Sequence, residues 1–526
     1  MDDFNKPNVV LPMTASLNQR GIEGFTAFDA DKDQLKVNTL YEMVGREVYL
    51  KKRPGFYDGG LTLGTASASD QPLYCVDPVS FDDLVWMLSN TAAGAIRAHT
   101  IGGVTHNIVS ASAGTYIPFV STVIISGLPH KIVQTAKGAG DPQNSVQRAF
   151  FSQGPITSWN EISASAFASE QVVHGKLEHI DGFTFALCKS NRIINSRINS
   201  LALWDRNDFI SKQIKSDLPV GLARLGGTLL AFGYETVEGF YNGGNAVGSP
   251  LARRAELSTN IGLGMWRVAG HFGNAAGTVG TRSYYAIVGN VLYFVGSVDG
   301  GKNQFGLYAF TGGAFEKVST RAVDRILAGA GLDTANDDFV ESVNRFTFQG
   351  REAVAISLKF ASAATQRWLM YFPDVKDWVE WNSTVFQPVG NGQYYVGTKG
   401  TYSNKVMTQD LSTGMVRWLD DSVTAYDMIH QFKLPKKSNA REAMAWCGVV
   451  ADSISASASS SAHGEGNLYV SFSDNDYQSF NTARVIDLTQ RKKQIYRCGS
   501  YEDRAVRLVH SGNAECRIQA FIARTL

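Results

Sequence analysis

Residues 283–296, SYYAIVGNVLYFVG, contain a complete β-hairpin pattern. Two apolar runs, YAIV and VLYFV, stand on either side of Gly289-Asn290, and both are rich in the aromatic and β-branched residues that strands prefer. A Gly-Asn pair between such runs favours a two-residue primed turn, because glycine adopts positive φ without steric cost. The stretch therefore predicts two antiparallel strands joined by a tight turn.

Runs of the same kind recur on both sides of this hairpin, over about residues 70–420. Each is as long as a strand and is closed by Gly, Asn or Asp. They are LYCV (73–76), LVWML (84–88), YIPFVSTVIIS (116–126), FTFALC (183–188), TLLAFGY (228–234), GLYAF (306–310), REAVAISLKF (351–360), WLMYFP (368–373) and QYYVGT (393–398).

Helical periodicity is sparse in this region. The best candidate is VSTRAVDRILAGAG (318–331), where Ser319 or Thr320 would cap a short helix or turn. Many short strands without alternating helices predict an all-β propeller, sandwich or barrel, and aromatic and glycine residues spaced over this length favour a β-propeller. No exact period fixes the number of blades.

The chain of 526 residues is too long for one ordinary core, so we expect several parts. Residues 1–56 predict an N-terminal arm of β-segments, and residues 57–430 predict the β-propeller core. Residues 431–526 predict a C-terminal β-region that forms a terminal domain or closes the propeller. Within it, the Ser/Ala/Gly tract at 450–466 predicts a flexible loop, because such residues cannot pack a core.

The overall charge is close to zero, with 49 Lys and Arg against 48 Asp and Glu. Proteins that grip nucleic acid by neutralising phosphates usually have a clear basic excess, so we expect any DNA contact to be local or loose. No apolar run approaches the ~18–20 residues of a membrane span. The N-terminus, MDDFNKPNVV, lacks the basic region and apolar run of a signal peptide, which predicts assembly in the cytoplasm.

Motifs of catalysis and cofactor binding are absent or incomplete. GSVDGGKN (296–303) comes within one residue of a P-loop, but Asn303 replaces the Ser or Thr that would hold Mg²⁺, and a strand-like run follows where a helix is needed. We interpret it as a Gly-rich hairpin loop. None of the nine histidines is part of an HExxH zinc-binding motif, and the GxSxG motif of a nucleophilic serine does not occur. The sequence therefore predicts no catalytic, cofactor-binding or metal site, and a protein that is not an enzyme.

The five cysteines are odd in number and widely separated, and none forms a CxxC motif. Disulfide frameworks and zinc sites need closer spacing or even pairing. We therefore expect reduced, buried thiols that act as small hydrophobes. The residues are Cys75, Cys188, Cys447, Cys498 and Cys516.

SDNDYQSF (473–480) resembles, in degraded form, the Asp-box turn of sialidase-like propellers, with Asn475 in place of its Asp. Even when intact, that motif is a structural hairpin turn. The alternative is a Ca²⁺ site at Asp474 and Asp476, although the glycine and distal glutamate of an EF-hand are missing.

Three basic clusters are candidate contacts for DNA phosphate or for an acidic partner surface. The alternative is that they are solvated strand ends and turns. No groove of alternating basic and aromatic residues is evident, which disfavours sequence-specific recognition of nucleic acid. The clusters are Lys51, Lys52 and Arg53; Arg253 and Arg254; and Arg491, Lys492 and Lys493.

Residues 222–264 carry a series of short motifs that resembles the packaged-DNA stabilisation (tail hub or nozzle) family of short-tailed bacteriophages. The motifs are Phe232-Gly233, then Thr236, Glu238 and Phe240 at alternate positions, Asn242-Gly243, Ser249-Pro250 followed by Arg253, and Ile261-Gly262. Residues 290–327, with Ser319-Thr320-Arg321-Ala322, resemble the hairpin and turn that follow in the family. The end of the chain, from SFSDNDYQSF onward, and KKRPGF (51–56) are also similar to family segments.

This resemblance implies a structural β-propeller subunit of the virion's short tail. Such subunits form a ring, typically a homohexamer, beneath the portal and the head-to-tail adaptor, and they contact other tail proteins or fibres. The ring extends the DNA channel, retains the packaged genome and lets DNA pass at ejection without sequence specificity. An internal plug, a mid-tail hub and a distal nozzle remain open alternatives.

Two other functions remain alternatives. One is a propeller-fold glycoside hydrolase or sialidase, which needs a pair of carboxylates that no local motif provides. The other is a receptor-binding tail protein, although such proteins are usually fibrous trimers with repeats. The lumen-facing residues, the neighbouring proteins and the host stay open.

Overall fold

The fold is taken from a computed structural model of the whole chain. It describes residues 7, 9–13, 34–45, 47–62, 71–76, 83–90, 96–99, 105–109, 119–137, 146–152, 159–162, 167, 169–173, 175–264, 283–298, 305–331, 339–359, 366–383, 388–389, 395–396, 406–410, 415–420, 426–434, 441–452, 466–475, 477–512 and 514–526. Most of the tract expected to be a flexible loop, residues 453–465, lies outside these ranges.

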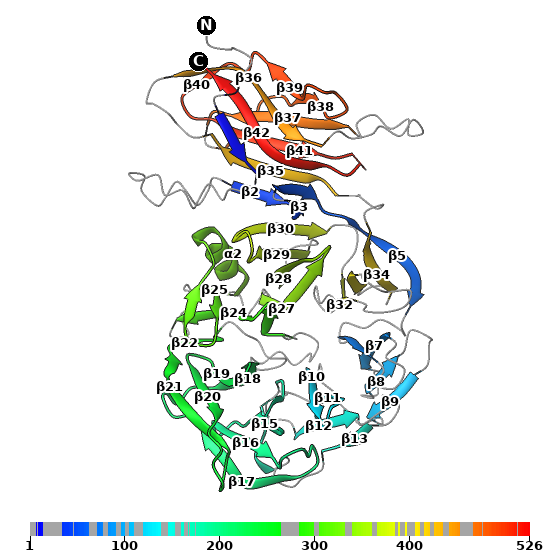
Figure 1. The fold of residues 1–526 in the computed structure, drawn as a ribbon, viewed down its shortest axis with the longest axis vertical. Coiled ribbons are helices and arrows are strands. Elements are labelled where there is room, and N and C mark those ends of the chain that lie inside the picture. Colours follow the sequence, from blue (N-terminus) through cyan, green and yellow to red (C-terminus); the bar gives the residue numbers. More distant parts are fainter. Residues whose placement is uncertain are drawn as a thin grey trace.

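Seven antiparallel units, each four strands deep, follow one another around a ring in the described part of the chain (Figure 1). We call them blades 1 to 7 in chain order. First strands such as β10 and β18 lie towards the middle of the ring, and last strands such as β17 and β21 lie on its rim. The prediction of an all-β propeller is confirmed.

Blade 1 has β6 (Gln71–Val76), β7 (Asp83–Asn90), β8 (Ile96–His99) and β9 (Thr105–Val109), and blade 2 has β10 (Phe119–Ile125), β11 (Leu128–Lys137), β12 (Val146–Ser152) and β13 (Trp159–Glu161). Blade 3 has β14 (Glu178–Ile180), β15 (Phe183–Leu187), β16 (Arg192–Ser196) and β17 (Trp204–Ser211). Blade 4 has β18 (Pro219–Leu225), β19 (Thr228–Gly233), β20 (Val237–Asn242) and β21 (Leu251–Thr259). In blade 5, β22 (Ile261–Gly262) and β23 (Tyr285–Val288) share one edge of β24 (Val291–Val298), followed by β25 (Phe305–Phe310) and β26 (Phe315–Lys317). Blade 6 has β27 (Phe339–Phe348), β28 (Arg351–Lys359), β29 (Gln366–Phe372) and β30 (Asp377–Ser383).

Two local predictions can be checked in blade 5 and the helix after it. In the β23–β24 hairpin Val288 pairs with Val291, so Gly289-Asn290 is a two-residue turn, and Gly289 has φ 60°. Helix α2 (Arg321–Gly331) begins directly after Thr320, whose Oγ1 accepts a hydrogen bond from the Val323 amide at 3.4 Å. The hairpin and the capped helix are both confirmed.

Blade 7 is completed by a strand from the N-terminal part of the chain. β31 (Pro388–Val389), β32 (Tyr395–Val396), β33 (Val406–Asp410) and β34 (Met415–Asp420) supply its inner positions, and β5 (Gly55–Thr62) pairs antiparallel with β34. The rings of Tyr57 and Trp418, which pair across these strands, are 5.1 Å apart. The N-terminal strand therefore closes the ring.

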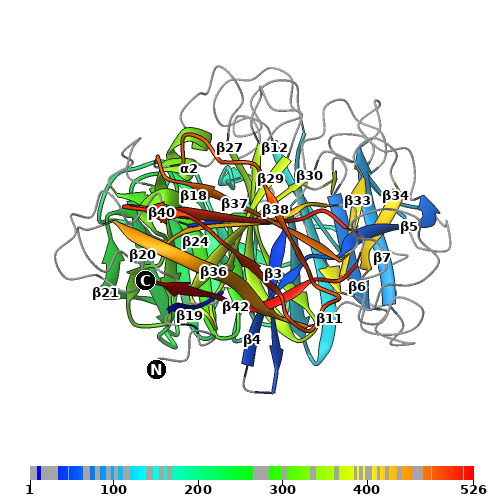
Figure 2. The same ribbon diagram turned by 90° about the horizontal axis from the view of Figure 1, so that it is seen from above.

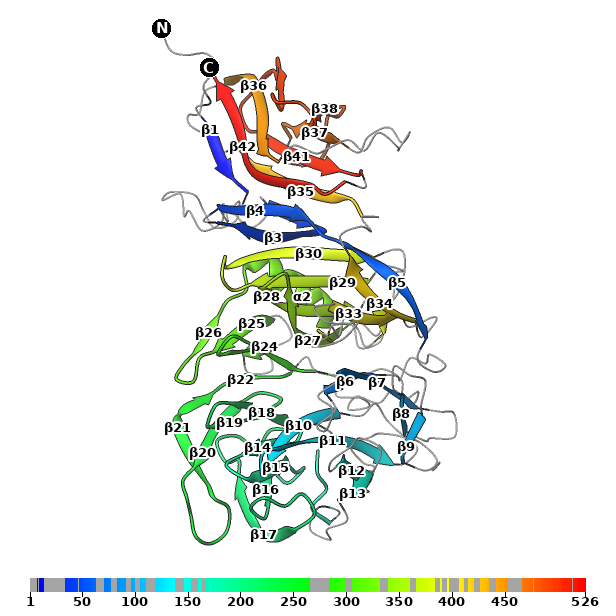
Figure 3. The same cartoon turned by 45° about the vertical axis from the view of Figure 1, so that its right-hand side comes forward.

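The remaining strands form an upper module outside the ring, next to blade 6 (Figure 3). They are β1 (Val9–Pro12), β2 (Gln34–Val37), β3 (Thr39–Val44), β4 (Glu47–Lys52), β35 (Met428–Lys433), β36 (Glu442–Ala451), β37 (Asn467–Ser473), β38 (Arg484–Asp487), β39 (Gln494–Tyr496), β40 (Ser500–Tyr501), β41 (Ala505–His510) and β42 (Arg517–Thr525). One sheet runs β3-β4-β42-β36-β39, and two further strands join it, β1 beside β42 and β40 beside β36. Seen from above, the β3–β4 hairpin extends beyond the rest of the ribbon (Figure 2).

The upper module and blade 6 share backbone pairing and a hydrophobic core. β2 lies parallel to β30 and antiparallel to β35, so one nine-stranded sheet runs from β27 to β38. Trp368 and Trp381 of blade 6 belong to the same buried cluster as Phe521 of β42. A second cluster joins blades 4, 5 and 6 with α2. The module is therefore an extension of blade 6, because burial of these apolar faces is what stabilises each sheet.

Candidate functional site

The family-like motifs of residues 222–264 make up blade 4 and its junctions with blades 3 and 5. Phe232-Gly233 ends β19, and Thr236 to Phe240 leads into and forms β20. Phe232 and Phe240 are fully buried, on opposite sides of the blade: Phe232 packs with the core of blade 5, and Phe240 with that of blade 3. The motifs therefore place apolar residues against both neighbouring blades.

The polar residues of these motifs bind the segment that connects blade 3 to blade 4. Oδ2 of Asp217, in that segment, accepts hydrogen bonds from the amides of Glu235 and Thr236 at 2.8 and 2.9 Å. Lys212 pairs with the same carboxylate and donates to Thr236 Oγ1 at 2.6 Å. Gly233 is required here, because an added Cβ would collide with the Asp217 carboxylate. The buried pair therefore fastens the connection to the β19–β20 turn.

Glu238 makes a second set of contacts with the segment that connects blade 3 to blade 4. Its carboxylate is fully buried and accepts hydrogen bonds from the amides of Gln213 and Ile214, the shortest at 2.9 and 2.8 Å. Arg253 Nε lies 3.3 Å from it, and Nη2 of Arg253 donates to Ser211 O at 2.8 Å. Thr236, Glu238 and Arg253 thus form a polar lock between blades 3 and 4, since buried charges require partners of this kind.

The first basic cluster lies inside the molecule. Arg53 is completely buried: its guanidinium lies 3.6 Å from the Tyr426 ring centroid and 4.9 Å from that of Trp381. Lys51 forms a salt bridge to Glu515 at 2.5 Å, and Lys52 donates to the Gly512 carbonyl. The interpretation as solvated strand ends is wrong for these three residues. Their charged groups contact the chain itself, which leaves them little surface for DNA or a partner.

The other two clusters keep more contact with solvent. Arg253 and Arg254 are half-buried, and Arg254 pairs with the exposed Glu256 at 3.0 Å. Between β38 and β39, Arg491 and Lys492 are exposed, whereas Lys493 is buried. Contact with DNA or a partner therefore stays a prediction, with Arg491 and Lys492 as its most accessible residues.

A polar cluster that the sequence did not indicate joins blades 3, 4 and 5. Tyr285 of β23 donates to Glu178 of β14 at 2.5 Å, and Lys176 Nζ lies 4.4 Å from the Tyr285 ring centroid. Burial raises the pKa of Glu178 to about 7, and burial lowers the pKa of Lys176. Tyr284 donates to Leu222 O of blade 4 at 2.5 Å. More than 100 residues separate Glu178 from Tyr285, so no local pattern could have revealed this cluster.

The family comparison covers the part of the chain that contains the polar lock. Residues 170–424 match the family described as Bacteriophage P22 Gp10, beta-propeller. This segment belongs to that family. It contains the complete lock between blades 3 and 4, and the match supports a phage structural protein.

Other comparisons add only general likeness. BamB from Moraxella catarrhalis is 12% identical with a TM-score of 0.32, over 70% of this chain and 98% of BamB. The computationally designed Ika8 protein is 8% identical with a TM-score of 0.33, over 68% of this chain and 98% of Ika8. Scores this low support no argument about function. No curated protein matches the chain.

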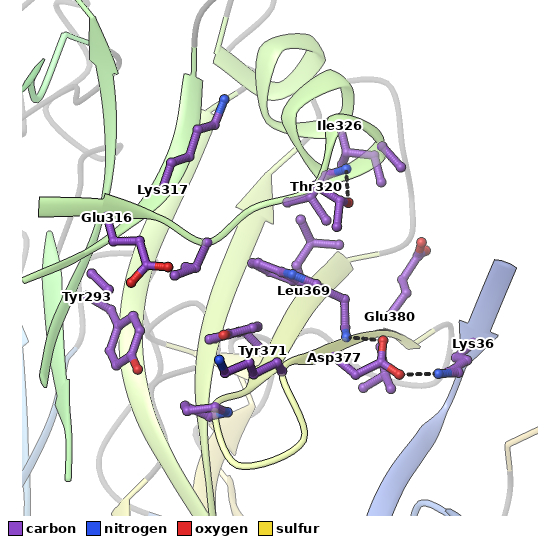
Figure 4. A pocket seen from close by; sticks show the side chains of 18 of the residues that line it. Lys36, Tyr293, Glu316, Lys317, Thr320, Ile326, Leu369, Tyr371, Asp377 and Glu380 are labelled. Atoms are coloured by element: carbon purple, nitrogen blue, oxygen red, sulfur yellow. Dashed lines mark hydrogen bonds and ion pairs between the residues drawn. The ribbon is translucent and has the colours of Figure 1, made fainter. Parts of the chain in front are cut away.

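A cavity of about 490 Å³ lies between blades 5 and 6 and α2 on one side and β2, from the N-terminal part of the chain, on the other (Figure 4). Tyr293 and Tyr371 are on its lining, and the pair formed by Lys36 and Asp377 lies at one end. Lys36 also donates to Tyr41 at 2.7 Å, and burial lowers the pKa of Lys36. These charged groups are already paired with each other, so at this end the cavity marks the joint between propeller and upper module.

Outside the Gp10-like segment, the Asp-box resemblance corresponds to a structural turn. Asn475 Oδ1 accepts hydrogen bonds from Ser473 Oγ and the Ser479 amide at 2.8 and 3.0 Å. Both carboxylate oxygens of Asp474 are bound by Arg504 at 2.7 Å, which leaves them poorly placed for Ca²⁺, and Asp476 lies outside the described residues.

The described residues contain little that indicates catalysis. No group of three or more His, Cys, Asp or Glu among them could hold a metal ion. β24 and β25, on either side of the P-loop-like stretch, pair antiparallel with Ser297 opposite Phe305, which confirms a hairpin. No described helix has the length and apolar character to cross a bilayer.

Proposed function

We propose that this chain is the ring-forming hub or nozzle subunit of a short phage tail. Copies of it extend the channel below the portal and adaptor, retain the packaged genome and let DNA pass at ejection. The observation that carries the proposal is the match of residues 170–424, which include the polar lock, to the phage Gp10 propeller family.

Rigidity and charge support this function. Seven blades closed by β5 and fastened by buried polar contacts form a stiff body with few open strand edges, as a particle component requires. A net charge of +1 suits a conduit, because strong phosphate binding would slow the passage of DNA. Arg491 and Lys492 would supply only loose contact with DNA or an acidic neighbour.

We further propose that the ring is a homohexamer assembled in the host bacterial cytoplasm. Its neighbours would be the portal, the head-to-tail adaptor and other tail proteins or fibres. A ring of identical subunits needs a head-to-tail interface between different faces of adjacent copies.

Mixing the purified protein with a portal–adaptor complex tests this function. Light scattering would give the mass of the assembly, and electron microscopy its shape. We expect a closed ring with an axial channel on the complex. A protein that stays monomeric and ignores the complex would refute the proposal and direct attention to the glycoside hydrolase alternative, to be tested by glycan-hydrolysis screens.

A further inference from the structure

Two cysteines that are 51 positions apart in the sequence meet in the upper module. Cys447 lies in β36, Cys498 follows β39, and their sulfurs are 3.7 Å apart. Both side chains are buried, with 0% and 6% of their surface exposed. Cys188 and Cys516 are also buried free thiols. The sequence spacing had suggested only isolated thiols.

Backbone hydrogen bonds hold the two cysteines on adjacent segments. Cys447 pairs with Ile495 in the β36–β39 ladder, and the Cys498 amide donates to Met444 O at 3.0 Å. A disulfide needs sulfurs about 2.05 Å apart, so the pair has to close by less than ~2 Å. Side-chain rotation with a small adjustment of the loop after β39 can supply such a movement.

The surroundings of the two sulfurs differ in a way that favours reaction. The hydrogen bond with Cys447, aided by Arg484, lowers the pKa of Cys498 to about 7. Arg484 Nη1 lies 3.9 Å from the Cys498 sulfur, and Arg504 donates to the Cys498 carbonyl at 2.5 Å. The pKa of Cys447 is raised by the same hydrogen bond and by burial. One partner is therefore a ready nucleophile while the other remains a thiol.

We propose that Cys447 and Cys498 are an oxidisable dithiol that closes to an intramolecular disulfide when the protein meets a small disulfide oxidant. The Cys498 thiolate attacks one sulfur of the oxidant, forms a mixed disulfide and releases one thiolate. Cys447 then attacks the Cys498 sulfur and passes its proton to the second thiolate as that thiolate leaves. Two protein thiols are oxidised, and one small disulfide is reduced to two thiols.

The bond would fasten β36 to the end of β39 and enclose the Ser/Ala tract in a covalent loop. A crosslink of this length restricts the unfolded chain and raises Tm by about 5 °C if the native geometry is kept. A protein made in a reducing compartment would gain this crosslink only after leaving it.

The test uses the full-length protein treated with bis(2-hydroxyethyl) disulfide, then alkylated and digested for mass spectrometry. We expect a Cys447–Cys498 linked peptide in the native protein and a higher Tm after oxidation. C447S and C498S should each lose the linked peptide and the Tm gain. C188S and C516S, which change buried cysteines elsewhere, should keep both.

Three outcomes would overturn the proposal. One is a persistent mixed disulfide at Cys498, which would mean that Cys447 does not reach it. The second is a linked peptide formed only in denaturant. The third is alkylation of both thiols after oxidant treatment of a protein whose circular dichroism shows that it is folded.

Discussion

Two runs of three basic residues, each with two lysines and one arginine, have the same composition and different environments. Lys51-Lys52-Arg53, at the end of β4, is buried against blade 6 and the segment before β42, whereas Arg491 and Lys492 of the second run are exposed. The difference lies in what covers each run. Arg53 is enclosed by the aromatic rings of Trp381 and Tyr426, but the second run occupies a connection between two short strands. A basic cluster in a sequence therefore does not by itself identify a surface that binds DNA.

The largest expected effect comes from removing the buried guanidinium. Arg53→Ala leaves the Asn382 carbonyl without its guanidinium donor, removes one of the two donors to Asn38 Oδ1, and opens a cavity between two aromatic rings. We expect unfolding free energy to fall by about 3–5 kcal/mol, measured by denaturant titration. Arg491→Ala is the matched control and should change it by less than ~0.5 kcal/mol. Equal effects in the two variants would contradict the contrast drawn above.

A pH effect should distinguish Lys52 from its exposed counterpart. Burial lowers the pKa of Lys52 from 10.5 to about 8 in the folded protein. Between these values the unfolded chain binds more protons than the folded one, so stability should rise as pH rises from 8 to 10.5. The gain relative to Lys52→Met should be on the order of 2 kcal/mol, measured by denaturant titration at several pH values. Lys492→Met, the control, should show the same dependence of stability on pH as the wild type. If Lys52→Met also shows the wild-type dependence, Lys52 does not cause the rise in stability.

The half-buried cluster Arg253-Arg254 should show an intermediate effect on stability. Arg253→Ala removes the cation beside Glu238, whose carboxylate keeps its two backbone amide donors. We expect a loss of about 1–2 kcal/mol in unfolding free energy. Arg254→Ala is the control, because its partner Glu256 is exposed and surface pairs contribute little. If Arg254→Ala proves the more damaging change, the polar lock does not depend on Arg253.

The smallest stability effect belongs to the exposed pair. Arg491→Ala with Lys492→Ala should leave Tm unchanged within the error of a thermal scan. If both side chains contact phosphate, the slope of log affinity for DNA against log salt should become shallower by about 2. An unchanged slope would remove these residues from the candidate DNA contacts and would favour an acidic protein partner instead.

Local features of the fold could be predicted from the sequence. The Gly289-Asn290 turn, the cap at Thr320 and the strand-like runs depend on neighbouring residues, so periodicity and turn chemistry are sufficient. The resemblance of residues 222–264 to the phage family was found in the same way, since its motifs are contiguous.

Long-range pairing could not be predicted. Arg53 contacts Asn382 across 329 positions, and only the fold brings the sulfurs of Cys447 and Cys498 close together. The role of Glu238 was missed because its partners are backbone amides of another blade, which leave no pattern in the sequence. The division into residues 1–56, 57–430 and 431–526 stays a proposal; β5 lies across its first boundary.

The closure of blade 7 by β5 has a consequence for biosynthesis. β5 leaves the ribosome before blades 1 to 6, and its partner β34 is made after them. At ~5–20 residues per second, the nascent chain waits roughly 20–70 s between the two strands. During that time the propeller is an open arc and β5 lacks its partner strand, so chaperones that bind unpaired strands should act on the chain mainly while translation is still under way.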